Sequence, residues 1–138
     1  MEPNKDRYQR AIRRCLAEAQ NAILKRTALV GLHKAESSHG LDFFRICDHA
    51  LYNDYISHAI RLFERSDQAA SFWYVLKSNE AAARAAAVSR SVSIPEIDAL
   101  TERLKGIRDK THFHINREAV VKPSEVWSEA AITGDELS

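Results

Sequence analysis

Residues 41–65 read LDFFRICDHALYNDYISHAIRLFER, and their pattern is the strongest indication of the fold class. Large apolar side chains recur around most of its helical circumference: Phe43, Phe44, Ile46, Leu51, Tyr52, Tyr55, Ile56, Ile60, Leu62 and Phe63. A helix that is apolar on nearly all sides is central to a bundle or buries a second face against another chain. We therefore expect this helix to lie at the centre of the fold. We also expect a homodimer that buries residues of this helix and of the last long helix.

The flanking segments also have helical patterns. Residues 5–33 carry apolar side chains at three- and four-residue steps, which form one stripe. Beyond the central stretch, Asp67 is expected to cap a helix that contains the apolar residues 72–76, FWYVL. Asn79 is expected to interrupt that helix, and an Ala-rich helix follows over residues 81–88.

The last long helix has the clearest start signal in the chain. Ser93 is a cap residue, Pro95 follows early, and Glu96 places an acid in the first turn. This helix is expected to end near residues 114–116, and residues 125–132 are expected to form a short C-terminal helix.

Composition agrees with this all-α fold class. The chain has 138 residues, which suits one domain, and only 4 Gly and 3 Pro, whereas an all-β domain needs many turns built from these residues. Hydrophobic residues make up 45% and charged residues 28%, which is ordinary for a globular protein. We predict that residues 1–138 form a single bundle of four to five helices plus the short C-terminal helix.

Charge is nearly balanced overall but is unevenly distributed. The net charge is +1, so the molecule as a whole is not a basic surface for nucleic acid. Residues 1–34 carry eight Lys and Arg against three Asp and Glu, while the acidic segment 118–138 carries one against five. The basic end is expected to meet phosphates or the acidic end of a neighbouring chain. No signal peptide or membrane span is recognised, so we expect a cytoplasmic protein.

Cofactor and metal motifs are sparse. The chain has no Gly-rich phosphate loop, no nucleophile elbow and no His-Glu-x-x-His pair, and Cys15 and Cys47 lack the spacing of a zinc or redox site. Asp54 and His58 lie four residues apart and can share a helix face, but a hydrogen bond between them is at least as good an interpretation as a pair of ligands. No metal and no cofactor is expected.

The densest polar spot is residues 108–116, RDKTHFHIN. An Arg beside histidines suits phosphodiester chemistry, because a guanidinium holds phosphate oxygens and a histidine moves protons near neutral pH. The alternative is a solvated basic helix end whose charges favour the C-terminal dipole.

The segment RDKTHFH, residues 108–114, resembles the signature of the HEPN superfamily (higher eukaryotes and prokaryotes nucleotide-binding). That signature is an Arg followed by a polar residue, with a His after four to six intervening residues. Arg108, Asp109 and His114 occupy these positions. Asn116 and the later Pro-x-x-Val-Trp of residues 123–127 are similar to the abortive-infection Abi-U-like subgroup. The helix layout agrees with this resemblance over nearly the whole chain.

The resemblance implies a helical homodimer in which two motifs face each other across a cleft. It implies a metal-independent RNA endonuclease of a toxin or anti-phage defence system, with RNA and an antitoxin or other protein as partners. Arg108 would hold the scissile phosphate, His114 would act as general base or acid, and Asp109 would hold Arg108 or a histidine in place. The RNA 2′-hydroxyl would attack the adjacent phosphate, giving a 2′,3′-cyclic phosphate and a 5′-hydroxyl. The alternative is a non-catalytic HEPN-type interaction or scaffold protein.

Helix geometry makes a second histidine an alternative candidate. At about 100° per residue, Arg108 and His112 lie within roughly 40° of each other on a straight α-helix, whereas His114 lies about 120° away. We therefore expect His114 to carry the reaction if the helix loosens near it or the partner chain supplies the second group. His112 is the alternative.

Other polar and aromatic residues are weaker candidates. Asp48, Asp54 and His58 on the central helix are expected to make hydrogen bonds in the core rather than to line the cleft. Aromatic side chains at helical spacing are candidates for base stacking, although core packing is the more common role: Tyr52, Tyr55, Trp73 and Tyr74. Three basic residues near the N-terminus are expected to form a solvated face: Arg10, Arg13 and Arg14.

Overall fold

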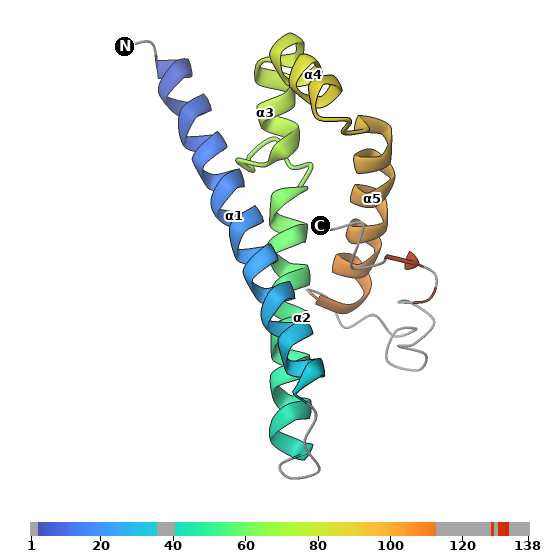
Figure 1. The fold of residues 1–138 in the computed structure, drawn as a ribbon. Helices are drawn as coiled ribbons and strands as arrows, with labels where there is room; N and C mark the ends of the chain where they lie inside the picture. Colours follow the sequence, from blue (N-terminus) through green and yellow to red (C-terminus); the bar gives the residue numbers. More distant parts are fainter. Residues whose placement is uncertain (1–2, 36–40, 113–127, 129, 133–138) are drawn as a thin grey trace.

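The structure is a computed structural model that describes residues 3–35, 41–112, 128 and 130–132 (Figure 1). Five α-helices follow one another: α1 (Pro3–Lys34), α2 (Leu41–Leu62), α3 (Phe72–Ser78), α4 (Glu80–Ser89) and α5 (Ile94–Ile107). A π-helical turn, η1 (Arg108–His112), continues α5. These ranges contain no strand, so the all-α prediction is confirmed. No helix among the described residues combines the length and the apolar character needed to cross a bilayer.

The second half of α2 forms the centre of the core. Helices α1 and α2 run antiparallel as a long hairpin, and α5 packs on α2 (Figure 1). Side chains of α2 meet Ala22 of α1, the apolar face of α5 and Ala130. The buried members of this cluster are Ala22, Tyr55, Ile56, Ala59, Ile60, Leu100, Leu104, Ile107 and Ala130. The central position predicted for this helix is confirmed for this half.

The first half of α2 has a different environment. Phe43 is 65% exposed and Ile46 is 68% exposed. This half lies at the end of the α1–α2 hairpin that projects beyond α3, α4 and α5 (Figure 1). Leu16, Ile23 and Leu24 of α1 are also more than half exposed. The hairpin therefore presents apolar side chains that its own chain does not bury.

The aromatic helix begins later than the sequence suggested. Asp67 was expected to cap it, but the cap residue of α3 is Ser71, and the Asp67 side chain is 97% exposed. A turn closed by the hydrogen bond from the Ala69 N–H to the Ser66 carbonyl occupies the intervening chain, so Asp67 is too far from the first helical N–H groups to cap them. Asn79 ends α3 and caps α4 by accepting a hydrogen bond from the Ala82 N–H at 3.4 Å.

Helix α5 begins where the cap signal placed it. The Ser93 hydroxyl accepts a hydrogen bond from the Glu96 N–H at 3.3 Å, and Pro95 lies in the first turn. The α-helix ends at Ile107 and passes into η1, while the predicted end near residues 114–116 lies outside the described residues. Of the predicted C-terminal helix at 125–132, residues 128 and 130 are helical, but residues 131 and 132 are not, so the helix does not reach the predicted end. The other residues of that helix and most of segment 118–138 lie outside the described ranges.

Candidate functional site

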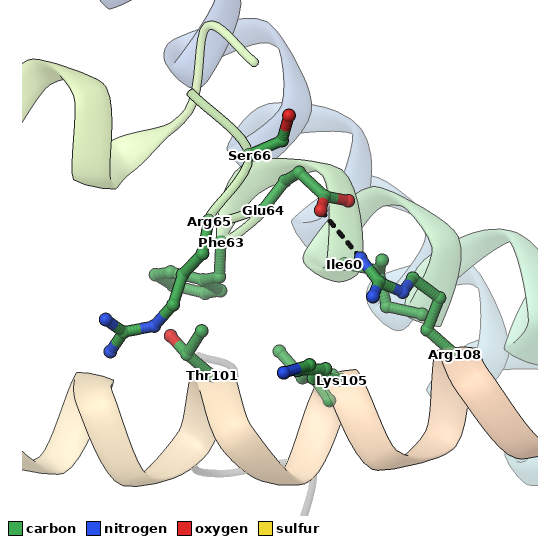
Figure 2. Close-up of a pocket in the computed structure, with 9 residues that line it drawn as sticks. Ile60, Phe63, Glu64, Arg65, Ser66, Thr101, Lys105 and Arg108 are labelled. Atoms are coloured by element: carbon green, nitrogen blue, oxygen red, sulfur yellow. Dashed lines mark hydrogen bonds and ion pairs between the residues drawn. The ribbon is translucent and has the colours of Figure 1, made fainter. Parts of the chain in front are cut away.

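Arg108 lies at the junction of α5 and η1, and two carboxylates hold its side chain. Its Nε donates to Asp109 Oδ1 at 2.8 Å, and one Nη donates to Glu64 Oε1 at 2.6 Å. Glu64 lies just after the end of α2, so this ion pair connects the end of α5 to the end of α2 (Figure 2). The Arg108 side chain is only 27% exposed. The guanidinium is therefore held in a defined orientation.

The local electrostatics keep Arg108 charged. The hydrogen bond to Asp109, together with the hydrogen bond and the charge of Glu64, raises the pKa of Arg108 despite partial burial, which acts to lower it. A guanidinium has five N–H donors, and among the described residues only Nε and one Nη nitrogen have acceptors. The second Nη nitrogen has no acceptor among these residues.

Beside Arg108 is a pocket of about 220 Å³ between the end of α2 and α5. Lys105 lines it from α5 and Arg108 from the start of η1, while Glu64 and Arg65 line it from the chain that follows α2 (Figure 2). Its other lining residues are Ile60, Phe63, Ser66, Thr101 and Leu104. Lys105 is exposed and makes no ion pair with any other residue that the structure describes. The pocket thus combines an apolar floor with cationic walls and one carboxylate.

Arg65 is held by contacts on two sides. It forms ion pairs with Asp98 and, at 3.4 Å, with Glu102, both on α5. Its guanidinium also lies over the ring of Trp73, 4.2 Å from the ring centroid. Trp73 in turn donates from Nε1 to the Thr101 hydroxyl at 3.1 Å. These contacts fix one wall of the pocket against α3 and α5.

The structure brings two of the four predicted site residues together, namely Arg108 and Asp109. His112 is the last residue of η1, and His114 lies outside the described residues. A π-helical turn has hydrogen bonds from i to i+5 and turns less per residue than an α-helix, so the angles of a straight α-helix do not hold from Arg108 to His112. Glu64 was not among the candidates. It is 44 positions from Arg108 and belongs to no motif, so no sequence signal indicated it.

A second polar cluster lies between α1 and α2, centred on Glu18. The Glu18 carboxylate contacts Nδ1 of His58 at 2.6 Å, Nε of Arg61 at 3.1 Å and a guanidinium nitrogen of Arg14 at 2.6 Å. The Glu18 side chain is 7% exposed and that of His58 is 14% exposed. Burial acts to raise the pKa of Glu18, but the hydrogen bonds from His58 and Arg61 and the charges of Arg61 and Arg14 hold it below its ordinary value.

The Asp54–His58 pair belongs to the same cluster. Nε2 of His58 lies 3.6 Å from Asp54 Oδ1, and Lys25 of α1 binds the other Asp54 oxygen at 2.8 Å. That hydrogen bond lowers the pKa of Asp54. Asp48 pairs with His33 at the other end of the hairpin. Within the described ranges, no three His, Cys, Asp or Glu side chains gather as metal ligands would. Asp48, Asp54 and His58 thus each form a polar contact between α1 and α2.

The remaining candidates have structural contacts. Arg10 pairs with Asp6 at 2.6 Å on the exposed side of α1. Cys15 and Cys47 are free and half-buried, and burial raises the pKa of the Cys15 thiol, which disfavours the reactive thiolate. Tyr55 is part of the core, whereas Trp73 and Tyr74 are half-buried.

Comparison of the chain with protein-family models, with curated proteins and with solved structures found no match. The case for a function therefore depends on the geometry around Arg108.

Proposed function

We propose that the protein is a metal-independent RNA endonuclease of a toxin or anti-phage defence system, of the HEPN type that its motif resembles. The observation that supports this most is the position of Arg108. Its guanidinium is charged, is oriented by Asp109 and Glu64, and borders a pocket. One of its Nη nitrogens has no acceptor among the described residues. A fixed guanidinium beside a pocket is the arrangement that holds and neutralises a phosphodiester.

In this mechanism Arg108 binds a non-bridging oxygen of the scissile phosphate and stabilises the charge that builds there. A histidine from the end of the motif, His114 or alternatively His112, removes the proton from the RNA 2′-hydroxyl. That oxygen attacks the phosphorus and the bond to the 5′-oxygen breaks, leaving a 2′,3′-cyclic phosphate and, once protonated, a 5′-hydroxyl. Asp109 and Glu64 position Arg108.

The active form in this proposal is a homodimer in which two such sites share a cleft. The exposed apolar side chains of the α1–α2 hairpin, including Phe43 and Ile46, support pairing through this part of the chain. On α5, Leu100, Leu104 and Ile107 already lie in the monomer's own core, so that helix would contribute its polar surface. An antitoxin or other protein partner belongs to the same proposal.

The second candidate function is a non-catalytic interaction or scaffold protein of the same type. The observation in its favour is that Glu64 and Asp109 already neutralise Arg108. An incoming phosphate would have to compete with two carboxylates, whereas a scaffold needs Arg108 only to connect α5 with α2.

The test is cleavage of unmodified single-stranded RNA by purified protein in excess chelator. We expect cleavage that persists without divalent ions and products with 2′,3′-cyclic phosphate ends. His114→Ala is expected to reduce the rate by about 10²–10⁴-fold, the usual contribution of general acid–base catalysis, and His112→Ala to have a much smaller effect. Sedimentation of the same sample is expected to give twice the mass of one chain.

Four results would count against parts of this proposal. Cleavage that disappears with chelator and returns with a divalent ion excludes the mechanism. A loss of activity in His112→Ala but not in His114→Ala reverses the assignment of the histidine. A chain that stays monomeric while fully active excludes the shared cleft, and the absence of any cleavage favours the scaffold.

A further inference from the structure

The pocket beside Arg108 shares two lining residues with a larger one. The second pocket measures about 680 Å³ and lies between the start of α1, the chain after α2, and α3. Arg65 and Ser66 line both pockets, so the two pockets are neighbours. We call these two neighbouring pockets together the joined groove, and its lining residues extend from Arg108 to Arg7 of α1.

Two aromatic residues with cations on their faces line the far part of the joined groove. Arg65 lies over the Trp73 ring at 4.2 Å, and Arg7 lies over the Tyr74 ring at 5.2 Å. The hydrogen bond from Trp73 to Thr101 fixes the tryptophan ring. Arg7 is an exposed residue of α1, so it can leave the tyrosine ring without disrupting the core. A flat ligand can therefore replace Arg7 on the face of the Tyr74 ring.

Basic residues outnumber acidic ones in the lining of the joined groove, and two of these basic residues, Arg65 and Arg108, already have carboxylate partners. Its basic lining residues are Arg7, Arg65, Lys77, Lys105 and Arg108, against the acidic residues Glu64, Asp67 and Glu80. The Lys77 side chain is 84% exposed and lies 4.0 Å from Asp67. An exposed ion pair of this kind contributes little, so Lys77 is available to another anion.

We propose that the joined groove binds single-stranded RNA on one side of the phosphate held by Arg108. A base stacks on Tyr74 in place of Arg7, whose guanidinium turns to a neighbouring phosphate, while Lys77 and Lys105 follow the backbone. Aromatic platforms interleaved with cations are how proteins bind single strands without reading sequence. The inference depends on the proposed function, and it extends that function by naming where the substrate strand lies.

The test measures binding separately from cleavage. A short single-stranded RNA with 2′-O-methyl groups at every position cannot be cut by 2′-hydroxyl attack, and its fluorescence anisotropy reports binding. We expect Tyr74→Ala to weaken binding by about fivefold to a hundredfold, the range for loss of one stacked base. Tyr74→Phe keeps the ring and is expected to bind as the wild type does.

Charge variants make the test independent of any folding defect in Tyr74→Ala. Arg7→Glu changes an exposed residue of the joined groove and is expected to weaken binding and to reduce its salt dependence. Arg13→Glu makes the same change at another exposed position of α1 outside the groove, and this matched control is expected to bind more tightly than Arg7→Glu.

The inference is overturned if Arg7→Glu and Arg13→Glu bind the RNA equally. It is also overturned if duplex RNA binds as tightly as the single strand. A third contrary result is an acidic peptide that displaces the RNA from wild type but not from Arg7→Glu, which would show that the groove binds a protein partner. If the variants bind RNA as predicted but the wild type does not cleave unmodified RNA, the proposed function is refuted and the assignment of the joined groove as an RNA-binding site is retained. If wild type and Arg7→Glu cleave RNA with equal KM, the RNA-binding role of the joined groove is refuted and the proposed function is retained.

Discussion

Glu18 is the most buried carboxylate among the described residues, and it accepts hydrogen bonds from His58 and Arg61 while pairing with Arg14. Because these partners stabilise the ionised form, the pKa of Glu18 in the folded chain lies below its ordinary value of 4.5. Between pH 4.5 and the lower pKa of the folded chain, Glu18 is therefore protonated more fully in the unfolded chain than in the folded chain. The stabilisation is therefore complete above about pH 4.5 and is lost as pH falls through the folded-state pKa.

We predict that Glu18→Gln lowers the free energy of unfolding at neutral pH by about 1.5–3 kcal/mol, the range for hydrogen bonds to charged groups. The deficit should shrink as pH falls below 4.5, because the wild-type carboxylate is then protonated as well. Urea unfolding over a range of pH values measures this. Asp6→Asn removes an exposed carboxylate from the Arg10 pair on the same helix and should change stability little. A deficit in Glu18→Gln that stays constant with pH would contradict this assignment.

At the scale of the elements, two serines precede helices but differ in their contacts. The Ser93 hydroxyl accepts from the Glu96 N–H at the start of α5. The Ser71 hydroxyl precedes α3, is buried, and has no hydrogen-bond partner among the described residues. We predict that Ser93→Ala destabilises the fold by about 1 kcal/mol, the usual cost of a lost cap.

Ser71→Ala is predicted to have the opposite sign and to stabilise the fold by about 1 kcal/mol, because it removes a buried polar group without a partner. Thermal unfolding of both variants alongside the wild type measures the contrast. A loss of stability in Ser71→Ala comparable to that in Ser93→Ala would show that the two caps are equivalent.

The same comparison shows what the sequence could predict about the elements. The start of α5 was predictable because Ser93, Pro95 and Glu96 act within one turn of each other. The start of α3 was not, because the turn from Ser66 to Ala69 separates Asp67 from the helix. The π-helical turn at Arg108 was not predictable either. Its hydrogen-bond shift has no residue signature, and it coincides with a contact to a distant glutamate.

At the scale of the whole molecule, the sequence indicated one part of the site and missed the rest. Arg108 and Asp109 could be named as candidates because the motif is local. Glu64, Arg65 and the joined groove depend on how α2, α3 and α5 pack, so residues far apart in the chain meet there. The apolar circumference of α2 predicted its central position, but periodicity alone could not show that Phe43 and Ile46 lie beyond the part that α5 covers.

The proposed mechanism depends most on Arg108, which is to hold the scissile phosphate. The most direct measurement is the single-turnover rate of RNA cleavage by Arg108→Lys, with Arg103→Lys as a matched control on the same helix outside the pocket. A lysine keeps the charge but cannot reproduce the planar, multi-donor contact with phosphate oxygens, so we predict a loss of about 10²–10³-fold, as for one oxyanion donor. Arg103→Lys should cleave at a rate near that of wild type. Cleavage by Arg108→Lys at the wild-type rate, with helix content unchanged in both variants, would contradict the account.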